Sequence, residues 1–395
     1  MTVTRSWVFV ALFALVVAAP LAAVDYTEEP FVPLSPEVMG RGESFVADAH
    51  GYDSLFFNPA GFSRENGSFT LLAGSSWIYS RPDALLTVGE GLVDGSSTTA
   101  SLLTYMNSQV TTGGLGAGAS AGIAYVGNGL GLGAVFIADS LLSGPTLLGM
   151  NGSLTGTLGF IGGLSFPLDL FGAKIHLGGD VRPMVRVRAP LTSGVALGVL
   201  SALATGGDAV SALNAAGSLY GVGIGLDIGS ILEVGWFTVG LSMRDLGGTQ
   251  FRYTQSTFGA TTSSLAASMK FPTGTAITAD TYTIPMDIRF GLSLHPDFGT
   301  FSGILDPSVS VDLDDVAGFL GGTSSVWTLL HAGAEVRILS LVSLSAGLNQ
   351  GYLTAGLGLK LLFLDINAAF FTRELGAHLG DQPNSGATLD VAIRW

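Results

Sequence analysis

The sequence contains no cysteine, and charged residues make up only 12% of its 395 positions. Without cysteine, no disulfide can hold the fold together, so the stability has to come from another source. The scarcity of charge argues against an ordinary soluble enzyme. The formal net charge of −14 argues against nucleic acid as a partner, because phosphate binding needs clustered Lys and Arg.

Long apolar runs are scarce as well, although 48% of the residues are hydrophobic. A helical membrane protein needs several runs of about 20 apolar residues. Beyond the N-terminus only residues 189–206 come near that length, and this stretch is rich in Gly, Ser and Thr. The composition therefore does not indicate a helical membrane protein.

Motifs of catalysis and metal binding are missing too. The five histidines are scattered without an HExxH spacing, and neither a G-x-S-x-G elbow nor a P-loop occurs. The acids Asp312, Asp314 and Asp315 lack the glycine and the terminal glutamate of a calcium loop. We therefore expect no enzyme activity, no metal and no cofactor.

Residues 1–23 have the organisation of a secretory signal peptide. Arg5 supplies the positive charge, residues 7–19 form the apolar core, and Ala23 ends a small-residue cleavage site. We expect the mature chain to begin near Val24, with an uncleaved anchor as the alternative. Export of this kind would place the protein in a bacterial cell envelope.

The C-terminus shows the pattern that most of the chain shares. From Leu389 to Trp395 every second residue is apolar, and Asp390, Ala392 and Arg394 stand between them. Neighbouring residues of a strand point to opposite faces, so one face of this segment is apolar and the other polar. Strands of an outer-membrane β-barrel have this character, apolar towards lipid and polar towards the lumen.

Similar alternation predicts fourteen strands and hence an all-β, antiparallel transmembrane barrel over residues 67–395. The predicted strands are 68–79, 117–126, 130–139, 153–166, 173–187, 218–228, 233–244, 284–295, 306–314, 328–338, 342–349, 352–361, 363–373 and 386–395. Short connections follow every second strand, and the longest of the others cover 80–116, 188–217 and 245–283. This alternation of short turns and long loops is typical of outer-membrane barrels. The tight turn at Gln350 and Gly351 is the exception.

The long loop at 195–216 is apolar and almost without charge, and we expect it to be helical. Two interpretations are compatible: a buried hairpin over the barrel mouth, or a landing surface for a hydrophobic ligand. Aromatic residues near strand ends are typical of the two membrane interfaces. We expect this position for Trp77, Tyr79, Trp236, Trp327 and Trp395.

The strand register turns many charged side chains into the lumen, where they escape the cost of facing lipid. One interpretation is a structural ladder of ion pairs between the wall and a plug. The other is a binding site for a carboxylate head group, because the planar guanidinium group donates two parallel hydrogen bonds. We predict that Arg182, Arg186, Arg188 and Arg244 form such a site.

Residues 39–49 read MGRGESFVADA and residues 54–61 read SLFFNPAG, just ahead of the first strand. This segment resembles the N-terminal hatch of the FadL family of long-chain fatty-acid outer-membrane transporters. The runs HAGAE at 331–335 and GYLTAGLG at 351–358 resemble its spirochaete and PorV-like branch. The sequence departs from the family pattern at 50–52, where a second acid is common.

The resemblance implies a hatch at residues 24–66 inside the barrel, with Asn58, Pro59 and Ala60 helping to gate a pocket. From the residues alone, Asn-Pro predicts a turn that directs the chain into the first strand. The implied function is passive transport of hydrophobic compounds such as long-chain fatty acids across the outer membrane. The alternative is a PorV-like barrel whose extracellular loops bind envelope proteins; an open porin is disfavoured by the hatch.

Overall fold

The computed structural model describes residues 26–81, 99–205, 208–268, 270–277, 280–322 and 325–395. The predicted signal peptide lies outside the described residues. Within them, fourteen strands form a closed antiparallel barrel, in which β18 pairs with β2 and β8 pairs with β12. The strands are β2 (Ser68–Tyr79), β3 (Leu115–Gly127), β4 (Leu130–Ser143), β5 (Asn151–Leu170), β6 (Ala173–Leu191), β7 (Gly217–Val234), β8 (Phe237–Arg244), β12 (Asp287–Leu294), β13 (Leu305–Leu313), β14 (Leu330–Ile338), β15 (Val342–Asn349), β16 (Tyr352–Leu361), β17 (Leu364–Glu374) and β18 (Pro383–Arg394). The predicted number and order of strands are confirmed.

The period-2 alternation separates the two faces of the wall as predicted. On β7, Val222, Ile224 and Leu226 point outward and are 48–64% exposed, whereas Asp227 points inward and is 3% exposed. An exposed apolar outer face is the surface that a β-barrel presents to lipid. The closed ladder pairs the backbone groups of neighbouring strands, so the barrel needs no disulfide.

One part of the wall is interrupted, which the sequence did not predict. Beyond the end of β8 the chain resumes as β9 (Thr249–Thr257), and β11 (Tyr282–Ile284) precedes β12. β7 pairs with both β8 and β9, and β9 pairs with β11, so these strands extend the wall past a break at residues 245–248 and 285–286. Asp245 has φ 50° and lies in the left-handed region, as do Gly247 and Gly248. The predicted loop 245–283 is therefore partly wall. Two-residue strands complete this edge: β1 (Tyr26–Thr27) on β11 and β10 (Thr275–Ala276) on β9.

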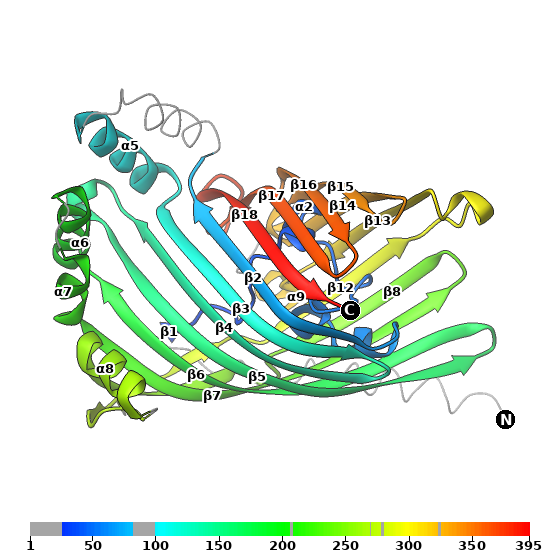
Figure 1. The fold of residues 1–395 in the computed structure, drawn as a ribbon, viewed down its shortest axis with the longest axis horizontal. Coiled ribbons are helices and arrows are strands. Elements are labelled where there is room, and N and C mark those ends of the chain that lie inside the picture. The colour runs from blue at the N-terminus through cyan, green and yellow to red at the C-terminus, as the bar shows by residue number, and fades with distance from the viewer. Residues whose placement is uncertain (1–25, 82–98, 206–207, 269, 278–279, 323–324) are drawn as a thin grey trace.

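Most helices of the long loops gather at one end of the barrel, while the short turns and the β12–β13 loop lie at the other (Figure 1). None of α5, α6, α7 and α8 contains a charged residue, and the helical prediction for 195–216 is confirmed by α6 and α7. None of the helices in the described part of the chain is long and apolar enough to cross a membrane. The helices in the loops are α5 (Thr99–Thr112), η2 (Leu147–Gly149), α6 (Ser193–Thr205), α7 (Ala209–Asn214), α8 (Phe258–Ser268), η3 (Gly299–Phe301), α9 (Val316–Leu320) and α10 (Val326–Leu329).

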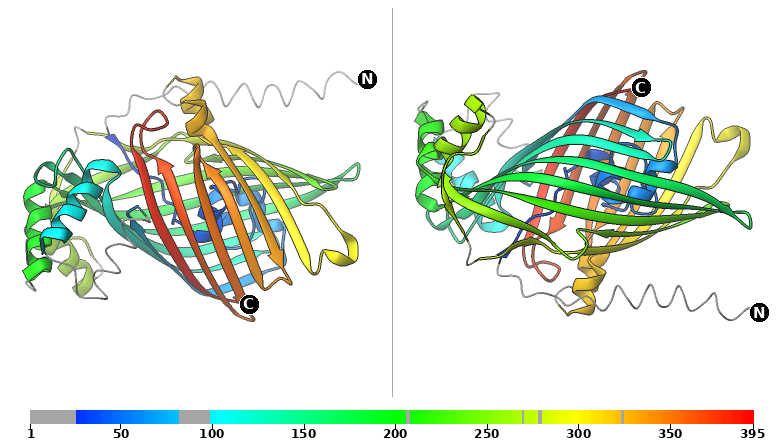
Figure 2. Two further views of the ribbon diagram at one scale, coloured as in Figure 1. Left: turned by 90° about the horizontal axis from the view of Figure 1, so that it is seen from above. Right: turned by 90° about the horizontal axis from the view of Figure 1, so that it is seen from below.

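Residues 28–66 lie inside the barrel and form three short helices, α2 (Pro36–Gly40), α3 (Ser54–Phe57) and η1 (Pro59–Ser63) (Figure 2). Their apolar side chains are almost fully buried, and they join residues of β2 to β7 in one hydrophobic cluster. Glycines of the wall make room for this segment. A Cβ at Gly240 would come within 2.6 Å of the Ala47 Cα, and one at Gly356 within 3.0 Å of the Gly40 Cα.

Two aromatic residues do not lie where we expected them. Trp77 and Tyr79 are 3% and 1% exposed and point into the lumen, where both donate hydrogen bonds to Asp139 of β4. The interface prediction is wrong for these two, because their positions on β2 belong to its inward face. Trp236, Trp327 and Trp395 are more than half exposed at element ends, as expected.

Candidate functional site

Arg182 lies on the inward face of β6 and is fully buried. Its Nη2 donates to Asp227 of β7 over 2.8 Å and to Asp245 of the wall break over 3.1 Å. The Nε of Arg244 lies 3.7 Å from the second oxygen of Asp227. Asp180 stands directly opposite Asp227 across the strand pair, and neither of its oxygens has a hydrogen-bond partner among the described residues. Two of the four predicted arginines thus belong to a buried cluster with three carboxylates.

Arg186 and Arg188, the other two predicted arginines, share a single carboxylate, that of Glu28. Nη1 of Arg186 and Nη1 of Arg188 each donate over 2.9 Å to a different oxygen of Glu28. Arg186 also donates from Nε to the Thr157 hydroxyl over 2.8 Å. Glu28 is 4% exposed, whereas 31% of the Arg188 side chain is exposed. The arginines that we expected to hold a carboxylate therefore hold one that the chain supplies itself.

Aromatic rings continue from Arg186 along the extended edge of the wall. Its guanidinium carbon lies 4.6 Å from the ring centre of Phe251, which stacks on Tyr253 with centroids 5.7 Å apart. Tyr253 meets Tyr282 edge-on at 4.9 Å, and Tyr282 stacks on Tyr26 at 4.8 Å. The row runs from the fully buried Phe251 to Tyr26, which is 47% exposed. The row forms a continuous aromatic stretch beside Glu28 that is buried except at Tyr26.

The Asn58-Pro59-Ala60 turn is held by the side chain of Asn58. The Asn58 Nδ2 donates to the Val46 carbonyl over 3.0 Å, and its Oδ1 accepts from the Ala60 amide over 3.1 Å. Asn58 is fully buried and forms the N-cap of η1, an ordinary use of asparagine at a helix start. The turn interpretation is confirmed, while gating stays a prediction.

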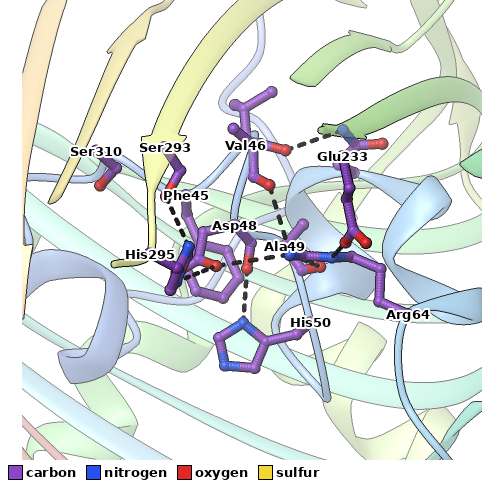
Figure 3. Close-up of polar contacts among 12 residues, drawn as sticks. Phe45, Val46, Asp48, Ala49, His50, Arg64, Glu233, Ser293, His295 and Ser310 are labelled. Carbon is purple, nitrogen blue, oxygen red and sulfur yellow. Dashed lines mark hydrogen bonds and ion pairs between the residues drawn. The ribbon is translucent and has the colours of Figure 1, made fainter. Parts of the chain in front are cut away.

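Ion pairs also tie the interior segment to the wall (Figure 3). Asp48 lies 3.2 Å from His295 at the end of β12, and Arg64 lies 2.7 Å from Glu233 of β7. Within the interior segment, Asp48 also lies 2.6 Å from Arg41. Burial opposes ionisation of Asp48, but the charge of Arg41 outweighs it and holds the pKa of this carboxyl well below its usual range. These contacts match the structural ladder that we considered as an alternative role for the inward charges.

A pocket of about 480 Å³ opens at the short-turn end, far along the barrel from the arginines, between the interior segment and the wall. Its lining includes Glu37, His50, Glu335, Arg337 and Trp395. Burial lowers the pKa of His50, yet the hydrogen bond and charge of Glu37 raise it overall to about 9. The acids and bases of this pocket pair largely with one another, which leaves little charge for a ligand.

Sequence reasoning missed Glu28 and Asp245, two of the acids that pair with the predicted arginines. Glu28 lies in a segment without strand pattern, and Asp245 lies in what looked like a loop. The only available signal was the run Asp245-Leu246-Gly247-Gly248, whose two glycines suit an interrupted strand. In the described part of the chain, no group of three or more His, Asp or Glu is arranged to hold a metal ion.

No family model and no curated protein matches this sequence. Among solved structures, the chain is similar to the toluene transporter TodX of Pseudomonas putida, with 10% identity, a TM-score of 0.46, and coverage of 94% of this chain and 99% of that one. It is also similar to the CymD monoaromatic hydrocarbon channel, with 13% identity, a TM-score of 0.47, and coverage of 91% of this chain and 96% of that one. A FadL homologue of Pseudomonas aeruginosa is similar too, with 12% identity, a TM-score of 0.45, and coverage of 91% and 98% of the two chains. Such likeness does not extend to function, so the site is interpreted from its own geometry.

Proposed function

We propose that this chain is a bacterial outer-membrane barrel that conducts hydrophobic compounds passively, with residues 24–66 as its hatch and residues 1–23 as its export signal. The observation that carries the proposal is the arrangement at the loop end. Helices without charge stand over a lumen edge that bears an aromatic row and a pair of arginines. An apolar solute gains free energy by leaving water for such an entrance, whereas a polar solute does not.

The filled lumen argues for selective passage rather than an open pore. The interior segment contacts the wall from β2 round to β18, and wall glycines bring the two backbones close together. A solute the size of a sugar would have to displace this segment. We infer that the segment acts as a hatch and that cargo passes beside it rather than through it.

The break in the wall offers a route out of the lumen. At residues 245–248 and 285–286 the ladder between neighbouring strands stops and resumes, near the inner end of the aromatic row. Pro285 has no N–H to donate to a strand ladder. On the neighbouring side of the break, Gly247 and Gly248 have positive φ angles. We propose that an alkyl or aryl chain leaves sideways here into the bilayer, driven by about 0.8 kcal/mol for each buried methylene.

The four arginines have two different roles in this proposal. Arg182 and Arg244 stabilise the wall beside the break through Asp227 and Asp245. Arg186 and Arg188 lie next to the aromatic row and are the residues that we propose to bind a ligand head group.

The test is lipid extraction and mass spectrometry on the protein purified in mild detergent from its native membrane, followed by titration with alkanols of increasing length. We expect a co-purified apolar compound, and affinity that rises about fourfold per added methylene. Single-channel recordings serve as the control for a porin. An empty barrel with steady ion conductance and no dependence on chain length would contradict the proposal.

A second candidate, binding of envelope proteins in the manner of the PorV-like barrels, has one observation in its favour. Val210 of α7 and Leu103 of α5 are 60% and 49% exposed on helices that carry no charge. Replacing residues 192–216 by a short Gly-Ser linker separates the two functions. Loss of co-purifying envelope proteins with ligand binding intact would favour the second candidate.

A further inference from the structure

Glu28 pairs with both arginines of the proposed ligand site. Each of its oxygens accepts a hydrogen bond from a different guanidinium, at 2.9 Å in both cases. Arginine is suited to carboxylates because its N–H groups match their geometry, and these hydrogen bonds are among the strong ones. A carboxylate head group arriving from the loop end would need the same two donors.

The segment that carries Glu28 has fewer contacts to the wall than the rest of the proposed hatch. Thr27 and Tyr26 are exposed, and β1 is a two-residue parallel strand at the edge of β11. Its main-chain ties are hydrogen bonds from the Tyr26 amide to Thr281 and from the Glu28 amide to Thr283. Short edge pairing of this kind opens easily.

The deeper hatch begins immediately after this segment. Glu29 and Pro30 are exposed, whereas Phe31 is 1% exposed and packs against Gly159 of β5. From Phe31 onward the interior segment is part of the hydrophobic cluster. Residues 26–28 can therefore leave β11 while the hatch from Phe31 onward keeps its contacts.

Resting on the proposed function, we propose that Glu28 is a built-in substitute for the head group of a carboxylate-bearing amphiphile. The ligand's carboxylate takes Arg186 and Arg188 from Glu28, and its tail lies along Phe251 and Tyr253. The exchange replaces two charge-assisted hydrogen bonds with two equivalent ones, so burial of the tail decides the outcome. A neutral hydrophobic compound does not compete with Glu28.

This mechanism links head-group binding to the position of β1. When Glu28 loses its arginines, the pairing of β1 with β11 and the stacking of Tyr26 on Tyr282 are the ties that remain on this side. Release of β1 uncovers the outer half of the aromatic row. Carboxylate ligands thereby open the path that they use, and the empty barrel keeps it covered.

The test compares the carboxylate dodecanoate with neutral dodecan-1-ol, which has the same chain length, by calorimetry on the full-length protein in detergent. Glu28→Gln keeps the shape but cannot compete as an anion, and the exposed Glu29→Gln is the matched control. We expect Glu28→Gln to tighten dodecanoate binding about tenfold and to leave dodecan-1-ol unchanged. Glu29→Gln should change neither. Equal affinities in the wild type and Glu28→Gln, or parallel shifts for both ligands, would overturn the inference.

A second variant uses the absence of cysteine from the chain. Thr27 and Thr283 are direct partners in the β1–β11 pair, so Thr27→Cys together with Thr283→Cys can form a single disulfide that locks β1 in place. The locked protein should lose dodecanoate binding and recover it on reduction. Unchanged dodecanoate binding in the locked form would show that Glu28 is a permanent structural partner. If neither ligand binds the wild type, the proposed function itself fails; if both bind without any response to these variants, only this inference fails.

Discussion

Replacement of Gly229 by alanine should loosen the interior segment from the wall without disturbing the strand that carries Gly229. Gly229 lies on the inward face of β7, where a Cβ would overlap the Oδ1 of Asn58 and approach the Pro59 Cδ to 3.1 Å. Gly229 is fixed in the strand ladder, so the Asn58 side chain has to move.

The expected loss of stability follows from the hydrogen bonds of the Asn58 side chain. Movement of its amide breaks the bond to the Val46 carbonyl and the one from the Ala60 amide, at about 1 kcal/mol each. Overpacking adds about 1–3 kcal/mol, because the displaced Asn58 side chain has to repack among buried neighbours. We expect the free energy of unfolding to fall by about 3–5 kcal/mol.

The measurement is urea unfolding in detergent, with ion conductance in planar bilayers as a second readout of a loosened hatch. Gly162→Ala on β5 is the matched control, because the nearest atom to its Cβ lies 3.9 Å away, on Leu132. We expect the control to change stability by less than about 0.5 kcal/mol. Equal stabilities of the two variants, or a stable Gly229→Ala, would refute the close contact between the interior segment and the wall.

Three further predictions concern buried charge. Arg182→Met leaves Asp227 without its closest partner in the interior, and we expect a loss of about 3–5 kcal/mol in urea unfolding, whereas a loss below about 1 kcal/mol would contradict a buried pair. The folded-state pKa of His50 lies above its ordinary value, at about 9, so its ion pair contributes fully below about pH 6.5 and is lost as the pH rises through 9. The melting temperature of the wild type should therefore fall more between pH 7 and 10 than that of His50→Gln, and parallel pH profiles would count against the pair. Asp312→Ala removes the acceptor of two buried backbone N–H groups of the interior segment, at Phe45 and Val46. We expect the free energy of unfolding to fall by about 2–4 kcal/mol and hydrogen exchange to become faster at both amides. Unchanged exchange at these amides would contradict the prediction.

The positions of the wall strands were predictable because their signal is local. An apolar residue at every second position is readable from the sequence without knowing what the strand pairs with, and turns limit each run. The same logic assigned Arg182, Arg186 and Arg244 to the lumen, since an arginine facing lipid costs about 2–4 kcal/mol. Barrel, strand order and inward charges were therefore determined by the sequence itself.

The partners of those charges were decided only by the tertiary structure. Glu28 meets Arg186 across 158 residues, and no periodicity relates a segment without strand pattern to a position on the wall. Asp245 engages Arg182 because a strand is interrupted there, which resembles a loop in the sequence. Alternation specifies the face on which a side chain lies, but a contact depends on which distant segment fills the space in front of that face. Barrel closure and the packing of the interior segment decide which contacts form, and both depend on the whole chain at once.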